Sequence, residues 1–496
     1  MKLFRLLDFL AKQSGRWGPL GVFLLAGCTV GPDYLRPQAP TAEHFNVPAG
    51  WKVAQAQDAD IPPDWWRLFK DQQLDQLEAR VAPANQTLAQ REAALRQARA
   101  LVDSAQAGLF PTLNLNADKT RNRASAGAIG LAQGLVYDNY LTDLQASWEP
   151  DLWGAIRRGV ESNVASLQAS AGQLAATRLT LQTQLAADYF QLRADDTQTQ
   201  LLADTVQADQ RFLELTQNRF DQGVAARTDV LQAETQWRSV QAQWLDVGVQ
   251  RAQLEHAIAV LVGVPASGFH LPPMPLLQEP PPVPLTLPSA LLERRPDIAA
   301  AERGAAAANA QIGVAQAAFF PTVTLGGNLG YQNRAYNNLV SQPNSMWAFA
   351  PQVQLPLFDG GLRAAALDQA RAAYDQAVAN YREIVLEAFQ NVEDNLAAAA
   401  ILARELTVQQ QAVQAADQTL KLTDDQYRQG TVGYLNVLTA QTVLLSNQLT
   451  EIALRSRQFV AHVQLVTALG GGWNPVQDPL SQAASATTLT SSAPSP

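Results

Sequence analysis

The chain has 496 residues, enough for two or three ordinary domains, but its composition is typical of long, closely packed helices. It is rich in Ala and Gln, only 16% of its residues are charged, and it contains a single cysteine. The formal net charge of −9 and the lack of a Lys/Arg cluster argue against a nucleic-acid partner, since phosphate binding needs such clusters. With one cysteine, no disulfide can form within the chain.

Residues 1–27 are predicted to be a bacterial lipoprotein signal peptide. Positively charged residues precede a short apolar run, which ends just before Cys28. The run is shorter than the roughly 20 residues that span a bilayer, so it indicates a secretion signal rather than an anchor helix. Residues 25–28 resemble the lipobox, in which cleavage before the cysteine leaves a lipidated N-terminus. Thr29 is not the aspartate that usually retains such lipoproteins in the inner membrane. The other interpretation is an incidental cysteine after a plain signal.

A lipidated extended segment over residues 28–64 is predicted to lead into a first repeat over 65–263. Period-two alternation indicates strands over about 112–117 and 143–150, each with one apolar and one polar face. A soluble sandwich and a lipid-facing barrel both show this alternation, so it does not decide between them. Apolar residues then recur at spacings of four and three within residues 155–262, a heptad pattern typical of long helices packed side by side.

A proline-rich linker over residues 264–288 is followed by a second copy of the same unit over 289–472. This repeat is predicted to have strands over about 322–331 and 349–357 and long helices over 361–468. The segments that recur in the same order are 105–113 as 315–323, 150–157 as 356–363, 220–223 as 427–430, and 230–235 as 437–442. Matches at nearly one offset indicate a duplicated domain.

The strand pairs limit how the mature chain could cross a membrane. No apolar stretch after the signal is long enough for a transmembrane helix, so only β-strands could span the bilayer. Four strands cannot close a barrel, because about eight are the known minimum, and an open edge in lipid leaves backbone groups unpaired. The chain is therefore expected to oligomerise, since two copies would supply eight strands and three would supply twelve. The tail over residues 473–496 is predicted to be disordered.

The sequence resembles the TolC-like outer-membrane efflux factors, in particular the NodT/OprM-type lipoproteins. The resemblance rests on Cys28-Thr-Val-Gly-Pro-Asp-Tyr34, on Trp65-Trp66-Arg-Leu-Phe69 and on the duplicated Phe-Pro-Thr and Gly-turn elements, and it extends to about Gly472. It implies an internally duplicated α+β membrane protein. The implied fold is a transmembrane β-barrel, with four strands per chain and twelve per trimer, that continues into a long periplasmic α-helical coiled-coil barrel.

The same resemblance implies a function. It is that of a homotrimeric exit duct in the outer membrane of a Gram-negative bacterium, passively conducting the substrates of a tripartite efflux pump. The implied partners are a periplasmic adaptor (membrane fusion) protein, an inner-membrane RND-type pump and outer-membrane lipid. No cofactor is implied besides the covalent lipid on Cys28. Two alternatives remain: the outer-membrane component of type I protein secretion, and a lipid-anchored periplasmic coiled-coil scaffold without a pore, which has no use for four alternating strands.

In that family the two helix turns form a periplasmic tip that meets the adaptor and closes the resting channel. The resemblance assigns to this tip Gly223, Val224, Arg227 and Thr228 in the first repeat, and Gly430, Val432, Gly433, Tyr434 and Leu435 in the second. It assigns Asp229 and Asn436 to the gate, although Asn436 and Thr439 stand where family members often carry carboxylates. A ring of Asp229 carboxylates would favour cations. Asp229 is equally suited to be a helix N-cap.

The sequence predicts no catalytic residue and no metal ligand. The four histidines (residues 44, 256, 270 and 462) are scattered, and none has a metal-ligand spacing to the cysteine or to a pair of carboxylates. There is also no phosphate-binding glycine loop and no nucleophile elbow. The chain is therefore not expected to be an enzyme.

Overall fold

The computed structural model describes residues 29–40, 61–125, 134–276, 279–281 and 294–473. The predicted signal peptide, Cys28, His44 and nearly all of the predicted tail lie outside these ranges. The chain divides into two compact units. Unit 1 comprises the chain up to residue 38 together with residues 95–169 and 301–381, and unit 2 comprises the remainder. No helix among the described residues combines the length and the apolar character needed to cross a bilayer.

Unit 1 contains a four-stranded antiparallel sheet in the order β1-β2-β3-β4. The strands are β1 (Thr112–Ala124), β2 (Leu135–Trp148), β3 (Thr322–Asn333) and β4 (Ser345–Gln354), with a short 3-10 helix η4 (Gln342–Asn344) before β4. The register places Leu115 opposite Leu144, Leu144 opposite Leu329, and Leu329 opposite Trp347. One face of the sheet is therefore apolar from edge to edge, and both strand pairs of the duplicated sequence join into one sheet.

The strands differ in extent from the predicted ones. The first predicted strand ends at about residue 117 and the second begins at about 143, but β1 continues to Ala124 and pairs with β2 from Leu135 onward. Hydrophobic alternation fails there because charged residues replace apolar ones, while the backbone pairing continues unchanged. At the other end β4 stops at Gln354 rather than at 357, which agrees with Pro356 having no N–H to donate to a sheet ladder.

The helical part of unit 1 holds the segment that follows Cys28. The N–H of Val30 donates to the carbonyl of Trp153, 3.1 Å away, just before α5 (Ala155–Asp221) begins. The buried guanidinium of Arg158 donates to the carbonyls of Val30 and Gly31 and forms an ion pair of 2.9 Å with Asp33. Residues 29–33 are thus fixed to the start of α5.

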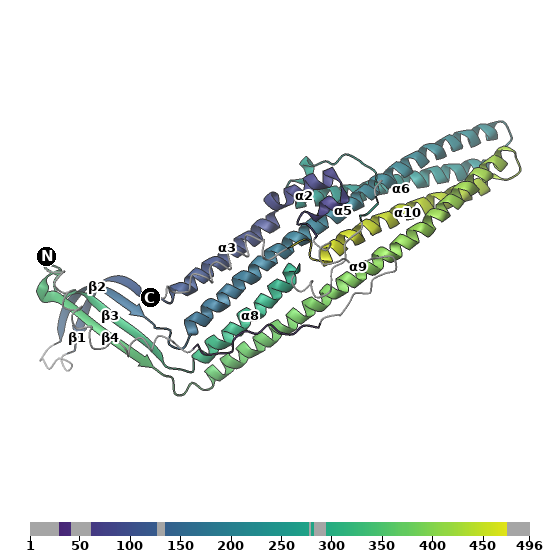
Figure 1. Cartoon of the computed structure of the whole chain (residues 1–496). Coiled ribbons are helices and arrows are strands. Elements are labelled where there is room, and N and C mark those ends of the chain that lie inside the picture. Colours follow the sequence, from purple (N-terminus) through teal and green to yellow (C-terminus); the bar gives the residue numbers. More distant parts are fainter. Residues whose placement is uncertain (1–28, 41–60, 126–133, 277–278, 282–293, 474–496) are drawn as a thin grey trace. The chain divides into compact units, whose positions relative to one another are not determined.

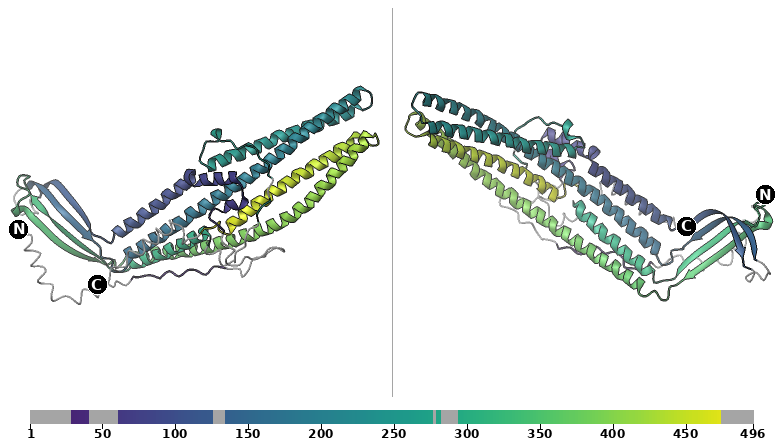
Figure 2. Two further views of the ribbon diagram at one scale, coloured as in Figure 1. Left: turned by 45° about the horizontal axis from the view of Figure 1, so that its top comes forward. Right: turned by 180° about the vertical axis from the view of Figure 1, so that it is seen from behind.

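Unit 2 contains two helical hairpins that lie side by side (Figures 1 and 2). They are α5 with α6 (Arg227–Leu261), and α9 (Leu362–Arg428) with α10 (Tyr434–Ala468); α5 and α9 begin in unit 1. α5 and α9 each have 67 residues, or about 100 Å at 1.5 Å per residue, and α6 and α10 each have 35. The remaining helices of the described residues are η2 (Trp65–Phe69), α2 (Gln72–Ala84), α3 (Gln86–Ala107), η3 (Ala266–Gly268) and α8 (Pro296–Ala317).

An aromatic core joins the N-terminal part of unit 2 to its long helices. Trp65 is fully buried, and Phe69 lies with its ring centroid 4.9 Å from that of Phe190 on α5. Phe190 stacks in turn on Phe459 of α10 at 4.6 Å. The Trp-Trp-x-x-Phe element therefore packs a short helix onto the long ones, with Trp66 left half-buried.

Candidate functional site

The two helix turns have the same backbone geometry. Gly223 and Gly430 each adopt φ of +76°, a conformation that glycine reaches without the steric cost of a Cβ. The N–H after each glycine bonds back across the helix end, from Val224 to the Arg219 carbonyl at 2.8 Å and from Thr431 to the Gln426 carbonyl at 3.0 Å. This is the Schellman ending of a helix, in which a left-handed residue satisfies the last carbonyls. Both glycines are therefore explained by the turns.

The tip residues fall into an exposed and a buried set. Gly223, Val224, Arg227, Thr228, Gly430, Gly433, Leu435 and Asn436 are exposed, and Val432 and Asp229 are half-buried. Tyr434 is different, because only 3% of it is exposed. The structure thus makes Tyr434 an internal packing residue of the tip, whereas the other predicted residues outline an accessible surface.

Asp229 is not the N-cap of α6, as one interpretation of the sequence had it. The helix begins at Arg227 and its N-cap is Ala226, which places Asp229 in the first turn. Its carboxylate accepts from the backbone N–H of Ala226, 3.4 Å away. A negative charge in the first helical turn is stabilised by the helix dipole. Asn436 has the equivalent place in α10, and its amide donates to the Gly433 carbonyl at 3.4 Å.

Aromatic side chains connect the two hairpins next to the tips. Phe212 of α5 stacks on Tyr434 of α10 with ring centroids 5.1 Å apart, and it lies 5.8 Å from the ring of Tyr427 on α9. Ala233 of α6 and Val437 of α10 complete the cluster. All four long helices therefore contribute to one apolar contact, which we call the tip cluster, and residue 434 is its centre.

A buried carboxylate, Asp209 of α5, lies beside the tip cluster. Asp209 is 4% exposed, and one of its oxygens has no hydrogen-bond partner. Burial raises its pKa to about 6, against the opposing effect of a hydrogen bond from Gln236 on α6. Burial also raises the pKa of Tyr434, and the charge of Asp209 adds to that effect. A carboxylate that titrates near pH 6 therefore sits where the hairpins meet.

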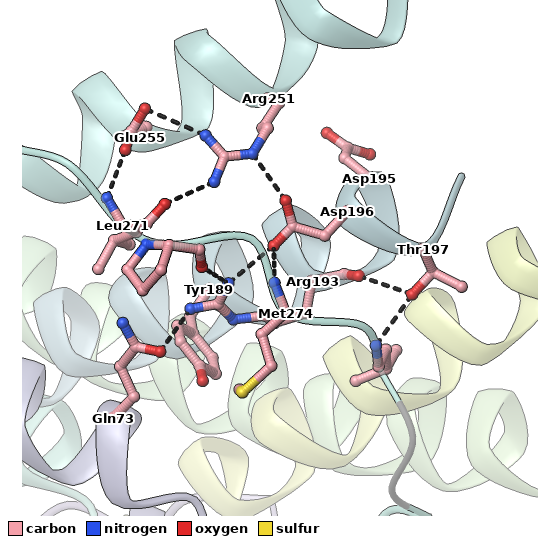
Figure 3. Close-up of polar contacts among 12 residues, drawn as sticks. Gln73, Tyr189, Arg193, Asp195, Asp196, Thr197, Arg251, Glu255, Leu271 and Met274 are labelled. Carbon is pink, nitrogen blue, oxygen red and sulfur yellow. Dashed lines mark hydrogen bonds and ion pairs between the residues drawn. The ribbon is translucent and has the colours of Figure 1, made fainter. Parts of the chain in front are cut away.

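Farther from the tips, an ionic network fastens the chain that follows α6 (Figure 3). Arg193 of α5, which is 1% exposed, pairs with Asp196 at 2.7 Å and donates to the Pro272 carbonyl at 2.9 Å. Arg251 of α6 pairs with Asp196 at 2.6 Å and with Glu255 at 3.2 Å, and it donates to the carbonyl of residue 271. These four charged residues, which we call the connector clamp, hold the start of the proline-rich linker against the first hairpin.

The connector clamp exists in only one of the two repeats. The repeat offset is 207 residues, as the paired glycines at 223 and 430 show, and it carries the clamp residues onto Ala400, Ala403, Gln458 and His462. None of these can reproduce the ion pairs. The sequence reasoning missed the clamp, although the i,i+3 spacing of Arg193 and Asp196 and the i,i+4 spacing of Arg251 and Glu255 were visible. A position-by-position comparison of the repeats would have found it.

Among the described residues, no group of three or more His, Cys, Asp or Glu side chains is placed to hold a metal ion. His462 is buried, its Nδ1 lies 2.7 Å from the carbonyl of Gln458, and burial lowers its pKa. His270 lies 2.9 Å from Glu255 at the edge of the connector clamp. These two histidines are thus occupied in structural contacts.

Comparisons with known proteins agree on one family. The sequence profile described as outer membrane efflux protein matches residues 80–264 and 287–471. A probable efflux pump outer membrane protein of Pseudomonas putida, TtgC, is 33% identical over 474 residues, covering 94% of this chain and 97% of the relative. A probable outer membrane lipoprotein of Salmonella typhimurium, SilC, is 29% identical and covers 91% and 97%. The solved outer-membrane channel OprN superposes with a TM-score of 0.83 at 29% identity, over 90% of this chain and all of that one.

Proposed function

Because this chain belongs to the outer membrane efflux protein family, we propose that it is the trimeric exit duct of a tripartite efflux pump. In this role it passively conducts substrates from an inner-membrane pump and a periplasmic adaptor across the outer membrane. TtgC, a probable efflux pump outer membrane protein, and OprN, an outer-membrane channel, resemble it over nearly their whole length and support this proposal. No step of this function requires catalysis or a cofactor.

The observation that carries the proposal is the incomplete sheet of unit 1. Its two edge strands, β1 and β4, pair on one side only, with β2 and β3, and no other described strand pairs with their outer edges. Leu113, Leu115, Trp347 and Phe349 expose large apolar side chains on these two strands. Unpaired backbone groups are too costly in lipid, so the edges must pair with further copies until the sheet closes. Three copies supply twelve strands, which is within the range of known membrane barrels.

The helices of unit 2 also carry exposed apolar surfaces that no other part of the described chain covers. Leu231, Leu245, Val249 and Val260 are exposed on one face of α6. On α9 the exposed residues Ile401, Val408 and Leu422 are spaced by seven and fourteen residues, which also places them on one face. Exposed apolar stripes at helical spacing are typical of surfaces that pack against other helices. In the trimer these stripes face neighbouring subunits and complete the wall of a helical duct.

We assign the exposed tip residues other than Asn436 to the contact with the adaptor, and Asp229 and Asn436 to the gate. Three Asp229 carboxylates around the axis would repel each other and attract cations. We expect Asp229→Ala to change single-channel conductance or cation block in planar bilayers. Asp221→Ala, at the exposed end of α5, serves as the charge-matched control. An unchanged current in the Asp229 variant would remove Asp229 from the gate.

The oligomer and the pore are tested together in purified protein. We expect a heat-resistant trimer in detergent and ion conductance after its insertion into bilayers. A purified protein that remains monomeric and non-conducting would contradict the proposal. The predicted lipid on Cys28 is tested separately by the intact mass of the mature protein, which should exceed the polypeptide mass by that of the attached acyl chains, and by the loss of that excess in Cys28→Ser.

A further inference from the structure

The charged residues of the sheet are sorted by face. The four strands carry six charged residues, all on β1 and β2: Asp118, Lys119, Arg121, Arg123, Asp138 and Asp143. Successive residues of a strand point to opposite faces. The three cations lie at every second position of β1, in the same alternation as Leu113 and Leu115, so they share the apolar face. Asp118 and Asp143 lie on the opposite, polar face.

The cations also lie toward one end of the apolar face, where Val136, which pairs with Arg123, is the only large apolar side chain of β2 that remains beyond Tyr140 on this face. Trp148 and Tyr140 bound the main apolar stretch of β2 on this face, and the eight residue steps from one to the other span about 26 Å along the strand. In a strand tilted by about 40° this corresponds to about 20 Å of membrane depth, close to the apolar band of roughly 25 Å in known barrels. Lys119 pairs in register with Tyr140, and Arg121 and Arg123 continue outward from it.

The three cations are open to a ligand. The Arg121 side chain is 75% exposed, and the nearest carboxylate, Asp138, is 3.8 Å away. The Lys119 ammonium lies 5.2 Å from the centroid of the Tyr140 ring, which leaves its N–H donors available. Arg123 is exposed. With three cations and one carboxylate, the face carries a net charge of +2 per chain at this end.

We infer that Lys119, Arg121 and Arg123, which we call the basic stripe, bind the phosphate groups of an anionic glycolipid in the outer leaflet of the outer membrane. The inference rests on the proposed function, because that function turns the apolar face toward lipid. Lys and Arg form strong charge-assisted hydrogen bonds with phosphate. The apolar face directly below the stripe accepts the acyl chains of the same molecule, which distinguishes a lipid from free phosphate.

The inference is tested by titrating detergent-solubilised trimer with bis-phosphorylated lipid A, dephosphorylated lipid A, phosphatidylethanolamine and inorganic phosphate. Wild-type protein is expected to prefer bis-phosphorylated lipid A, and this preference should weaken with salt. The variant Lys119→Gln/Arg121→Gln/Arg123→Gln should bind this lipid at least about tenfold more weakly, since each cation near an anionic lipid surface contributes severalfold. Planar-bilayer conductance of the same variant should be unchanged.

A matched variant tests whether the face matters. Adding Thr120→Lys and Asn122→Lys to the triple variant restores two charges on the opposite face, and it should not restore binding. Equal binding by wild type and triple variant, rescue by the relocated charges, or full competition by inorganic phosphate would each overturn the inference. A non-conducting wild type would instead contradict the proposed function. If the triple variant does not assemble, Arg121→Gln and Arg123→Gln are measured singly, each expected to weaken binding about threefold.

Discussion

Replacing Asp209 by Asn is expected to tighten the contact between the two hairpins at the tips. Asp209 is buried beside Tyr434, and burial raises its pKa from 3.8 to about 6. A carboxyl group with a higher pKa in the folded state binds more protons there than in the unfolded state. Its contribution to stability is therefore largest at low pH, decreases as the pH rises from about 4 to 6, and is lost above that range.

The difference between the two pKa values corresponds to at most about 3 kcal/mol at neutral pH. Partial hydration of the carboxylate reduces this, and we expect about 1–2 kcal/mol of local stability to be recovered in Asp209→Asn. Local opening of the tip should then become roughly 5- to 30-fold rarer at pH 7.5. In the wild type, lowering the pH to 5 should recover part of the same effect, on the order of 1 kcal/mol.

Hydrogen–deuterium exchange of peptides covering Phe212, Tyr427 and Tyr434 measures this opening, after correction for the intrinsic pH dependence of exchange. Asp204→Asn provides the control, because Asp204 is an exposed carboxylate on the same helix. The expected result is slower exchange at the tip in Asp209→Asn and no change in the control. If Asp209→Asn and wild type showed the same pH dependence of exchange between pH 5 and 7.5, the reasoning would be refuted.

Two further predictions concern packing. Arg193→Met leaves the buried Asp196 without one of its two cations, and it should destabilise the attachment of the linker by about 3–5 kcal/mol. The measurement is the rate of proteolysis after α6, which should increase. Arg211→Met, at an exposed position of the same helix, is the control and should have no effect. Gly330→Val should abolish heat-resistant trimers, because a Cβ at this position would collide with the backbone of β2. Gly326→Val is the control and should retain the trimers, because a Cβ there would lie 3.4 Å from the Ala350 carbonyl. Normal trimer yield from the residue-330 variant would contradict the observed close approach of β2 and β3.

Much of the fold could be predicted from the sequence because the chain contains two copies of the same unit, which can be compared with each other. The repeated glycine turns set the ends of the helices, and α5, α6, α9 and α10 lie where the heptad pattern and the Gly223 and Gly430 signals indicated. Resemblance to the efflux factors supplied the family, which the comparisons confirm. Because many side chains contribute to the helical periodicity, single substitutions do not hide it, and local sequence patterns were sufficient to predict the long helices.

Tertiary structure decided what local patterns could not. Lys119 and Arg121 have the two-residue parity of Leu115, but only the backbone pairing shows that β1 continues to Ala124, which places them on the same face of the sheet. The burial of Tyr434, and the charge of Asp209 that adds to the rise of its pKa, involve helices whose residues lie more than 200 positions apart in the chain. Sequence spacing determines which residues share one element, whereas burial and charge pairing depend on which elements meet, and that follows only from the packed fold.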